Sequence, residues 1–250
     1  MDISILLYIL VGFIAQIIDG ALGMAYGVST NTFLLSLGLP PAAASASVHM
    51  AEVVTTGVSG ISHWRLGNID WKLVRRLLLP GVIGGVAGAY LLTSIDGDVI
   101  RPYISAYLLI MGAFILYKAF HQNTHVNDGT HTRRVSLLGV IGGFCDAIGG
   151  GGWGPVVTTT LVARGKNPRL TIGSVNYSEF FVTFAQSVVF VLTLSFSQYW
   201  QIILGLLIGG AIAAPLAARV TKTLPVRGLM ILVGTLIVIL SIRTIYLSLT

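Results

Sequence analysis

Apolar stretches alternate with short polar ones along the whole chain of 250 residues. A helix needs about 20 consecutive apolar residues to cross the hydrocarbon core of a bilayer. Six stretches have that length, and they are residues 44–62, 73–95, 102–120, 170–194, 199–218 and 228–249. Two further apolar regions, 3–37 and 134–163, are interrupted by glycine, and each is interpreted as a helix, a break and a shorter helix that either crosses the membrane or forms a re-entrant hairpin. The pattern predicts an all-α polytopic membrane protein with about 8–10 transmembrane segments.

The composition narrows the class of protein further. Hydrophobic residues make up 54% of the chain and charged residues 10%, whereas a soluble domain carries about 25% charged residues. These values exclude a disordered chain and argue against an ordinary soluble enzyme. Cys145 is the only cysteine, which excludes an intrachain disulfide and a cysteine metal site. Because no basic stretch precedes them, residues 3–18 are predicted to be a retained membrane segment rather than a cleaved signal peptide.

The positions of the basic residues predict the topology. Nearly all of the 15 Lys and Arg residues fall in four connections, near 65–76, 118–134, 164–169 and 219–227, and only Arg101 and Arg243 lie elsewhere. Basic loops of membrane proteins face the cytoplasm. The chain is therefore predicted to be a multi-pass protein of a bacterial-type inner (plasma) membrane with both termini outside. The pI near 9.7 then reflects these loops and not nucleic-acid binding.

The chain also contains an internal repeat. Shifted by 127 positions, residues 12–56 align without a gap with residues 139–183. The connection 38–43 holds no base whereas its partner 164–169 holds three, so two inverted-topology repeats with glycine-broken helices are predicted. The first transmembrane repeat is placed at 1–120, a polar cytoplasmic linker at 121–133 and the second transmembrane repeat at 134–250. The three histidines of the linker are interpreted as part of a solvated loop rather than a metal site.

Both glutamates of the chain lie inside predicted membrane segments, at repeat-related positions. An ionised acid near the bilayer centre costs about 2.5–3.5 kcal/mol, so such residues usually carry function. Glu52 and Glu179 lie on polar helix faces that include His49 and Asn176. Inverted repeats are a design shared by many secondary transporters, and we predict that these four residues couple transport to protons or gate it. The alternative is that they form interhelical hydrogen bonds that hold the bundle together.

The glycine-rich breaks are the candidate substrate site. Backbone N–H groups and the positive dipole end of a helix that begins at such a break favour an anion, and no Lys or Arg lies mid-membrane to hold one instead. The candidate substrate-binding residues are Gly23, Tyr26, Gly27, Ser29, Thr30, Asn31, Gly150, Gly151, Gly152, Trp153, Thr158 and Thr159. The alternative is tight helix packing through small residues. A nucleotide-binding loop is disfavoured because no Gly-Lys-Ser/Thr follows.

Two aspartates, Asp19 and Asp146, precede the breaks at repeat-related positions. Their carboxylates bind a coupling cation or proton, repel wrong substrates, or cap the following helix, and the capping role is slightly favoured. A cation carrier remains open, because four acids within the membrane can attract a cation.

The duplicated motifs resemble a known family. They are the Asp-x-x-x-Gly-x-x-x-Gly-type segments at 19–27 and 146–155, the Gly-x-x-Pro loops at 38–41 and 165–168, and the Ser-Val-x-x-x-Glu motifs at 47–52 and 174–179. Together they resemble the sulfite exporter TauE/SafE family of membrane transporters over essentially the whole chain. The first copy lacks the glycine run and has Val28 where the second has Pro155. The resemblance implies an inner-membrane carrier for small sulfur-containing anions such as sulfite, thiosulfate or sulfoacetate.

The expected function is therefore secondary transport of a small anion by alternating access, with protons as the candidate coupling ion. A passive anion channel and a cation- or proton-coupled carrier of another solute are the alternatives. An enzyme is not expected, because His49 and Glu52 form no HExxH motif and have no third partner on their helix face. No cofactor and no metal site are expected. The expected partners are the small anionic substrate and the lipid bilayer, with the protein a monomer or a homodimer.

Overall fold

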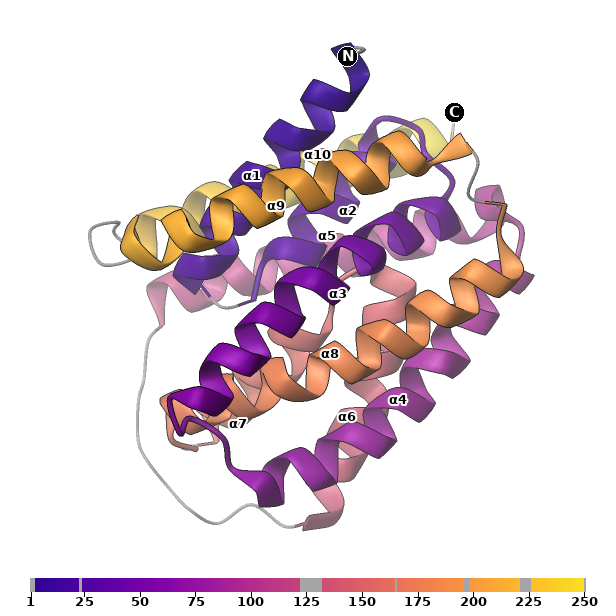
Figure 1. Ribbon diagram of the computed structural model, residues 1–250. Helices are drawn as coiled ribbons and strands as arrows, with labels where there is room; N and C mark the ends of the chain where they lie inside the picture. The colour runs from indigo at the N-terminus through magenta and orange to yellow at the C-terminus, as the bar shows by residue number, and fades with distance from the viewer. Residues whose placement is uncertain are drawn as a thin grey trace.

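The computed structural model describes residues 3–22, 24–121, 132–164, 166–195, 198–220 and 226–249. Within these residues the chain is all-helical, as predicted (Figure 1). The elements are α1 (Ile3–Leu22), α2 (Tyr26–Ser36), α3 (Pro41–Arg65), α4 (Trp71–Ser94), α5 (Gly97–Phe120), α6 (Thr132–Gly149), a short π-helix η1 (Trp153–Thr158), α7 (Thr159–Ala163), α8 (Pro168–Thr193), α9 (Trp200–Val220) and α10 (Val226–Leu249).

Four of the described helices are both long and apolar enough to cross a membrane, and they are the segments Trp71–Ser94, Gly97–Phe120, Arg169–Thr193 and Arg227–Ser248. Both glycine-interrupted regions form a helix, a break and a shorter helix. The shorter helix α2 has 11 residues, which at 1.5 Å per residue extends about 16 Å, roughly half of the hydrocarbon core. We call α2 and the continuous segment η1–α7 the half-helices.

The helix boundaries repeat with the same shift of 127 positions. It carries α2 (Tyr26–Ser36) onto η1 and α7 (Trp153–Ala163), and it carries Pro41, where α3 begins, onto Pro168, where α8 begins. The most extensive helix contacts join α1 with α9 and α4 with α6 (Figure 1). The shift carries α1 onto α6 and α4 onto α9. Each pair therefore joins one helix of the first copy to one helix of the second copy.

The repeat-related helices α3 and α8 pack antiparallel. Gly57 lies against Phe180, and Gly60, further along α3, lies against Tyr177, which comes earlier in α8. An inverted duplication produces antiparallel packing of this kind. The opposite orientation of the two copies in the membrane stays a prediction, as does the division into repeats and linker, because residues 122–131 of that linker lie outside the described residues.

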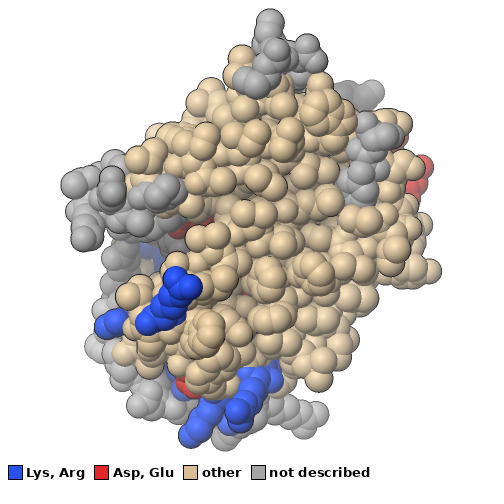
Figure 2. All heavy atoms as spheres, viewed as in Figure 1, with Lys and Arg blue, Asp and Glu red and all other residues tan. Residues whose placement is uncertain are grey.

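Exposed basic side chains gather at one end of the molecule, where the α3–α4 and α7–α8 connections lie (Figure 2). The two basic residues outside the predicted cytoplasmic loops have a structural role at the C-terminal end of α2. Arg101 donates to the carbonyl oxygens of Gly38 and Leu39, each at 3.2 Å. Arg243 donates to the carbonyl oxygen of Ser36 at 2.6 Å. Positive side chains at a helix C-terminus satisfy its last carbonyls and oppose its dipole.

Candidate functional site

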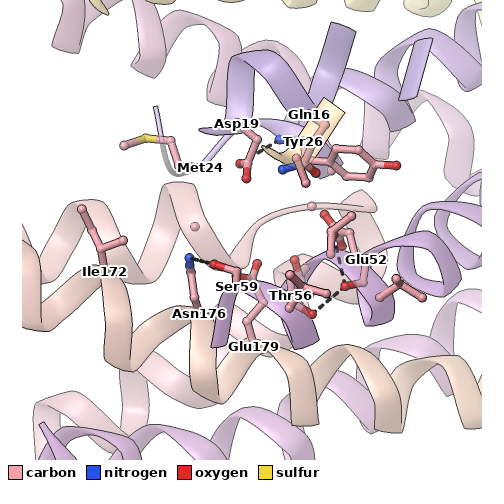
Figure 3. A pocket seen from close by; sticks show the side chains of 18 of the residues that line it. Gln16, Asp19, Met24, Tyr26, Glu52, Thr56, Ser59, Ile172, Asn176 and Glu179 are labelled. Atoms are coloured by element: carbon pink, nitrogen blue, oxygen red, sulfur yellow. Dashed lines mark hydrogen bonds between the residues drawn. The ribbon is translucent and has the colours of Figure 1, made fainter. Parts of the chain in front are cut away.

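A cavity of about 510 Å³ lies between the two helix breaks, a size that suits a small ligand. Figure 3 shows Gln16, Asp19 and Tyr26 on one side of it, and Glu52, Glu179, Thr56, Ser59 and Asn176 on the other. Nine of the candidate residues line this cavity, and they are Asp19, Tyr26, Gly27, Glu52, Asp146, Gly151, Gly152, Asn176 and Glu179. The fold therefore brings residues from α1, α2, α3, α6 and α8 to one place.

The two breaks touch each other at their glycines. A Cβ atom at Gly27 would lie 2.6 Å from the carbonyl oxygen of Gly150 and 2.8 Å from Oε1 of Glu52. Gly150 and Gly151 have φ angles of +62° and +148°, which glycine adopts without strain. Asn31 donates from Nδ2 to the carbonyl oxygen of Gly149 at 2.5 Å. The glycines are thus needed both for the path of the chain and for the close approach of the two half-helices.

Two aspartates cap the half-helices through the same pair of hydrogen bonds. Oδ1 of Asp19 accepts from the backbone N–H of Ala25 at 2.8 Å and of Tyr26 at 3.2 Å. Oδ1 of Asp146 accepts from the N–H of Gly152 at 2.7 Å and of Trp153 at 2.9 Å. These bonds satisfy donors that a helix N-terminus otherwise leaves unpaired, as the capping role requires. The same bonds occupy backbone N–H groups that were predicted from the sequence to bind an anion.

Asp146 has further side-chain partners. Its Oδ2 lies 3.2 Å from Nε2 of His49 and accepts from Nε2 of Gln186 at 3.1 Å. Nδ1 of His49 lies 2.7 Å from the carbonyl oxygen of Ser45. Because both ring nitrogens of His49 face acceptors, either both carry a proton or the carboxyl of Asp146 carries one. His49 is fully buried and does not itself line the cavity.

The glutamates approach the cavity from α3 and α8. Glu52 is 5% exposed, and its buried Oε2 has no hydrogen-bond partner among the described residues. Thr56 donates to the backbone carbonyl of Glu52 at 2.6 Å, so its hydroxyl does not satisfy the carboxylate. A buried oxygen without a hydrogen-bond partner raises the free energy of the folded state. A ligand or a proton that reaches the cavity can supply the missing hydrogen bond.

Several candidate substrate-binding residues do not line the cavity. Successive helix residues are rotated by about 100°, so many side chains of each half-helix face other helices and not the cavity. Ser29 donates to the carbonyl oxygen of Ala25 in its own helix, and the indole N–H of Trp153 donates to the carbonyl oxygen of Val175 at 3.1 Å. The other candidates away from the cavity are Thr30, Asn31, Gly150, Thr158 and Thr159. Gly23 lies outside the described residues.

Two polar groups near the cavity are missing from the sequence-based candidates. Gln16 lines the cavity, and its buried Oε1 has no partner among the described residues. The ammonium of Lys118 lies 3.3 Å from Oγ1 of Thr159 and 3.8 Å from Sδ of Met24, which lines the cavity. The sequence assigned Lys118 to a loop flank, but the last turn of α5 directs it toward the breaks. Its position inside the predicted span 102–120 was the available signal.

At the end of α3, the cavity is lined by Ser62, the last residue of the predicted span 44–62, and by His63, which follows it. Nδ1 of His63 lies 3.3 Å from Nδ2 of Asn68, whose Oδ1 accepts from Nε of Arg169 at 2.6 Å. Burial and the positive charge of Arg169 lower the pKa of His63 below its usual value. The cavity therefore extends to the end of the molecule where the basic side chains gather.

Comparison with known proteins identifies the family. The family model described as sulfite exporter TauE/SafE matches residues 8–244. A probable membrane transporter protein of Bacillus subtilis, YtnM, is 42% identical over 247 residues, which cover 96% of this chain and 82% of that protein. A probable membrane transporter protein of Haemophilus influenzae is 29% identical over 178 residues, covering 68% and 67% of the two chains. No solved structure matches. The chain thus belongs to the sulfite exporter TauE/SafE family, and it is a membrane transporter and not an enzyme.

Proposed function

We propose that the protein carries a small sulfur-containing oxyanion or organosulfonate, of the sulfite, thiosulfate or sulfoacetate type, across the inner membrane by alternating access. The observation that carries this proposal is the cavity at the meeting point of the two half-helix N-termini. The description of the matching family names sulfite, which agrees with this class of substrate.

The half-helices supply donors for an anion. Asp19 and Asp146 occupy the N–H groups of Ala25, Tyr26, Gly152 and Trp153. The next residues along the two half-helices, Gly27, Val28 and Gly154, line the cavity. Their N–H groups belong to the first turn, where the helix dipole is positive. The candidate donors of this proposal are therefore the backbone N–H groups of Gly27, Val28 and Gly154, and the candidate residues Tyr26, Gly151 and Gly152 shape the same cavity.

Lys118 supplies the positive charge. The described residues contain no carboxylate in ion-pairing contact with its ammonium, which instead contacts Thr159 and Met24 beside the break. A half-buried ammonium without an acidic partner favours an anion nearby. This observation favours an anion carrier over a cation carrier.

Glu52 and Glu179 couple the anion to protons in this proposal. Both line the cavity, and among the described residues no basic side chain forms an ion pair with either of them. An anion beside ionised glutamates in a site of low dielectric is strongly disfavoured. Protonation of the glutamates removes the repulsion, so the anion enters together with protons.

The orientation follows from the basic end of the molecule, which we place in the cytoplasm by the positive-inside rule. Ser62 and His63 bring the cavity toward that end. The described conformation is then open to the cytoplasm, with both termini outside.

Uptake into proteoliposomes tests the proposal. Radiolabelled sulfite and thiosulfate are offered with and without an inward proton gradient, to the wild type and to Glu52→Gln and Glu179→Gln. The gradient is expected to stimulate wild-type uptake, and both variants are expected to lose that stimulation. Unchanged uptake and pH dependence in both variants would remove the coupling role. Saturation and counterflow support a carrier, whereas unsaturated flux without counterflow indicates a channel.

A second experiment tests the anion site itself. Sulfite, thiosulfate, sulfoacetate, taurine and sulfate are compared for thermal protection of the wild type, Lys118→Met and Lys118→Arg, with exposed Lys72→Met as the control. Loss of a charge-assisted hydrogen bond of about 1.5–3 kcal/mol is expected to weaken anion binding roughly tenfold or more in Lys118→Met. Lys118→Arg and Lys72→Met are expected to keep most of the protection. Full protection in Lys118→Met would exclude this lysine from the site.

A further inference from the structure

The two helix breaks have the same backbone hydrogen bonds but different side-chain partners. The shift that carries Asp19 onto Asp146 also carries His49 onto Asn176 and Ser59 onto Gln186. Each aspartate therefore has a corresponding pair of possible partners, one from α3 and one from α8. His49 and Gln186 belong to Asp146, and Ser59 and Asn176 belong to Asp19.

At Asp146 these contacts are made. His49 and Gln186 both lie within hydrogen-bond distance of Oδ2, at 3.2 Å and 3.1 Å, and Asp146 is 1% exposed. Nε2 of Gln186 also donates to the carbonyl oxygen of Gly143 at 3.1 Å. The contacts fasten α3 and α8 to α6 next to the break.

At Asp19 the corresponding contacts are absent. Nδ2 of Asn176 donates to Oγ of Ser59 at 2.9 Å, so the two side chains satisfy each other. Figure 3 shows this pair across the cavity from Asp19. Asp19 is half-buried, with Oδ1 on its helix cap. The cavity separates this pair from Asp19, and Ile172 is among the residues that line it.

We propose that these two sets of side chains are alternating latches of the transport cycle. In the described state the Asp146 latch is closed and the Asp19 latch is open. In the opposite state Asn176 and Ser59 turn from each other to Asp19, His49 and Gln186 leave Asp146, and the cavity opens at the other end. This inference rests on the alternating-access function proposed above. It assigns His49 and Gln186 as positioning residues, which act through Asp146 and do not touch the substrate.

The physical basis is that each latch joins the same two helices to a different broken helix. The α3 and α8 pair cannot approach both breaks by the same movement if the copies are inverted, so closing one latch opens the other. The partners also differ in strength. Only histidine can form an ion pair with the carboxylate in addition to a hydrogen bond, whereas an amide or a hydroxyl forms the hydrogen bond alone, so a histidine favours the state in which its own latch is closed.

Cysteine labelling tests the latches. Ile172→Cys, at a half-buried position that lines the cavity near the start of α8, is introduced in a Cys145→Ala background, which removes the only native cysteine. Its reaction with a membrane-impermeant maleimide is followed in inside-out vesicles. His49→Asn gives Asp146 the partner that the other copy has, and Asn176→His gives Asp19 the stronger one. Each is expected to shift the population toward the opposite state and to slow labelling about tenfold.

His121→Asn, the same substitution at an exposed residue at the end of α5, is the control and is expected to label at the wild-type rate. Asn176 is only half-buried, so Asn176→His remains informative if His49→Asn does not fold. Wild-type labelling rates in both variants would overturn the latches while leaving the transport proposal intact. Absence of substrate uptake by the wild type would instead overturn the transport proposal, whatever the labelling rates.

Discussion

The contact between the two breaks leads to a quantitative prediction for Gly27→Ala. The new Cβ would lie 2.6 Å from both the carbonyl oxygen of Gly150 and Cα of Gly151, whereas ordinary contact begins at 3.4 Å. The breaks must therefore separate by about 0.8 Å, the difference between those distances. Both opposing atoms are backbone, which cannot move aside by a change of rotamer.

Overpacking of this kind costs up to about 3 kcal/mol, and replacing a helical glycine with alanine returns up to about 1 kcal/mol. A net loss of about 2 kcal/mol corresponds to a fall in Tm of about 4–8 °C for a chain of this length. Thermal unfolding in detergent measures it, and anion uptake is expected to fall because the cavity changes shape.

Gly57→Ala on α3 is the matched control. Its Cβ would lie 3.2 Å from the side-chain ring of Phe180, which can shift. This variant is expected to keep or slightly raise the Tm and to keep uptake. If Gly27→Ala has the same Tm and the same uptake rate as the wild type, the two breaks are not in contact and the site described above is wrong.

Three further predictions concern the surroundings of the cavity. Trp153→Phe removes the buried hydrogen bond from the indole N–H to the carbonyl of Val175 and is expected to lower stability by about 1–3 kcal/mol. Tyr26→Phe is expected to lower stability less, because the tyrosine hydroxyl makes a long hydrogen bond of 3.3 Å, and equal Tm values for the two variants would contradict this order. Arg101→Gln and Arg243→Gln are each expected to lower stability by about 0.3–1 kcal/mol, because both cap α2, and an unchanged Tm in the double variant would refute that role. The pKa of His63 is lower in the native state than in the unfolded chain, so the unfolded chain binds a proton first as the pH falls below 6.5 and stability is lost on acidification. The variant His63→Gln should lose less stability, measured as the difference in Tm between about pH 7.5 and about pH 5.5.

The sequence predicted the features that depend on local pattern or on the repeat. Apolar length and interrupting glycines located the helices and both breaks, since these properties act within a few residues. The aspartate caps were also predictable, because Asp19 and Asp146 each bond to N–H groups only 6 and 7 residues ahead.

Contacts between distant segments were not predictable in the same way. Lys118 is 94 residues from Met24 and 41 from Thr159, and no periodicity links a lysine at the end of one helix to a break in another. His49 and Asp146 are 97 residues apart. The polar face of α3 was visible in the sequence, but the helix that it meets was not.

The rotation of the half-helices explains the remaining differences. The path of the chain through a break sets the direction in which each side chain of the following half-helix points. Four consecutive glycines can follow many paths, so the sequence does not specify that direction. Thr30 and Thr158 are hydroxyl side chains close to the breaks, yet both are buried away from the cavity. Proximity to a break in the chain therefore did not identify the residues that line the cavity.

The proposed anion site must be reconciled with the four acids that line the cavity. Asp19 and Asp146 each direct an oxygen to two N–H groups at a helix N-terminus, where negative charge is stabilised. Glu52 has no such partner for its buried Oε2, and Glu179 lies on the cavity at the equivalent position. A negative charge on either aspartate is thus compensated by the backbone wherever the caps are kept. The glutamates form no such cap, which is why the proposal assigns proton coupling to Glu52 and Glu179 and not to the aspartates.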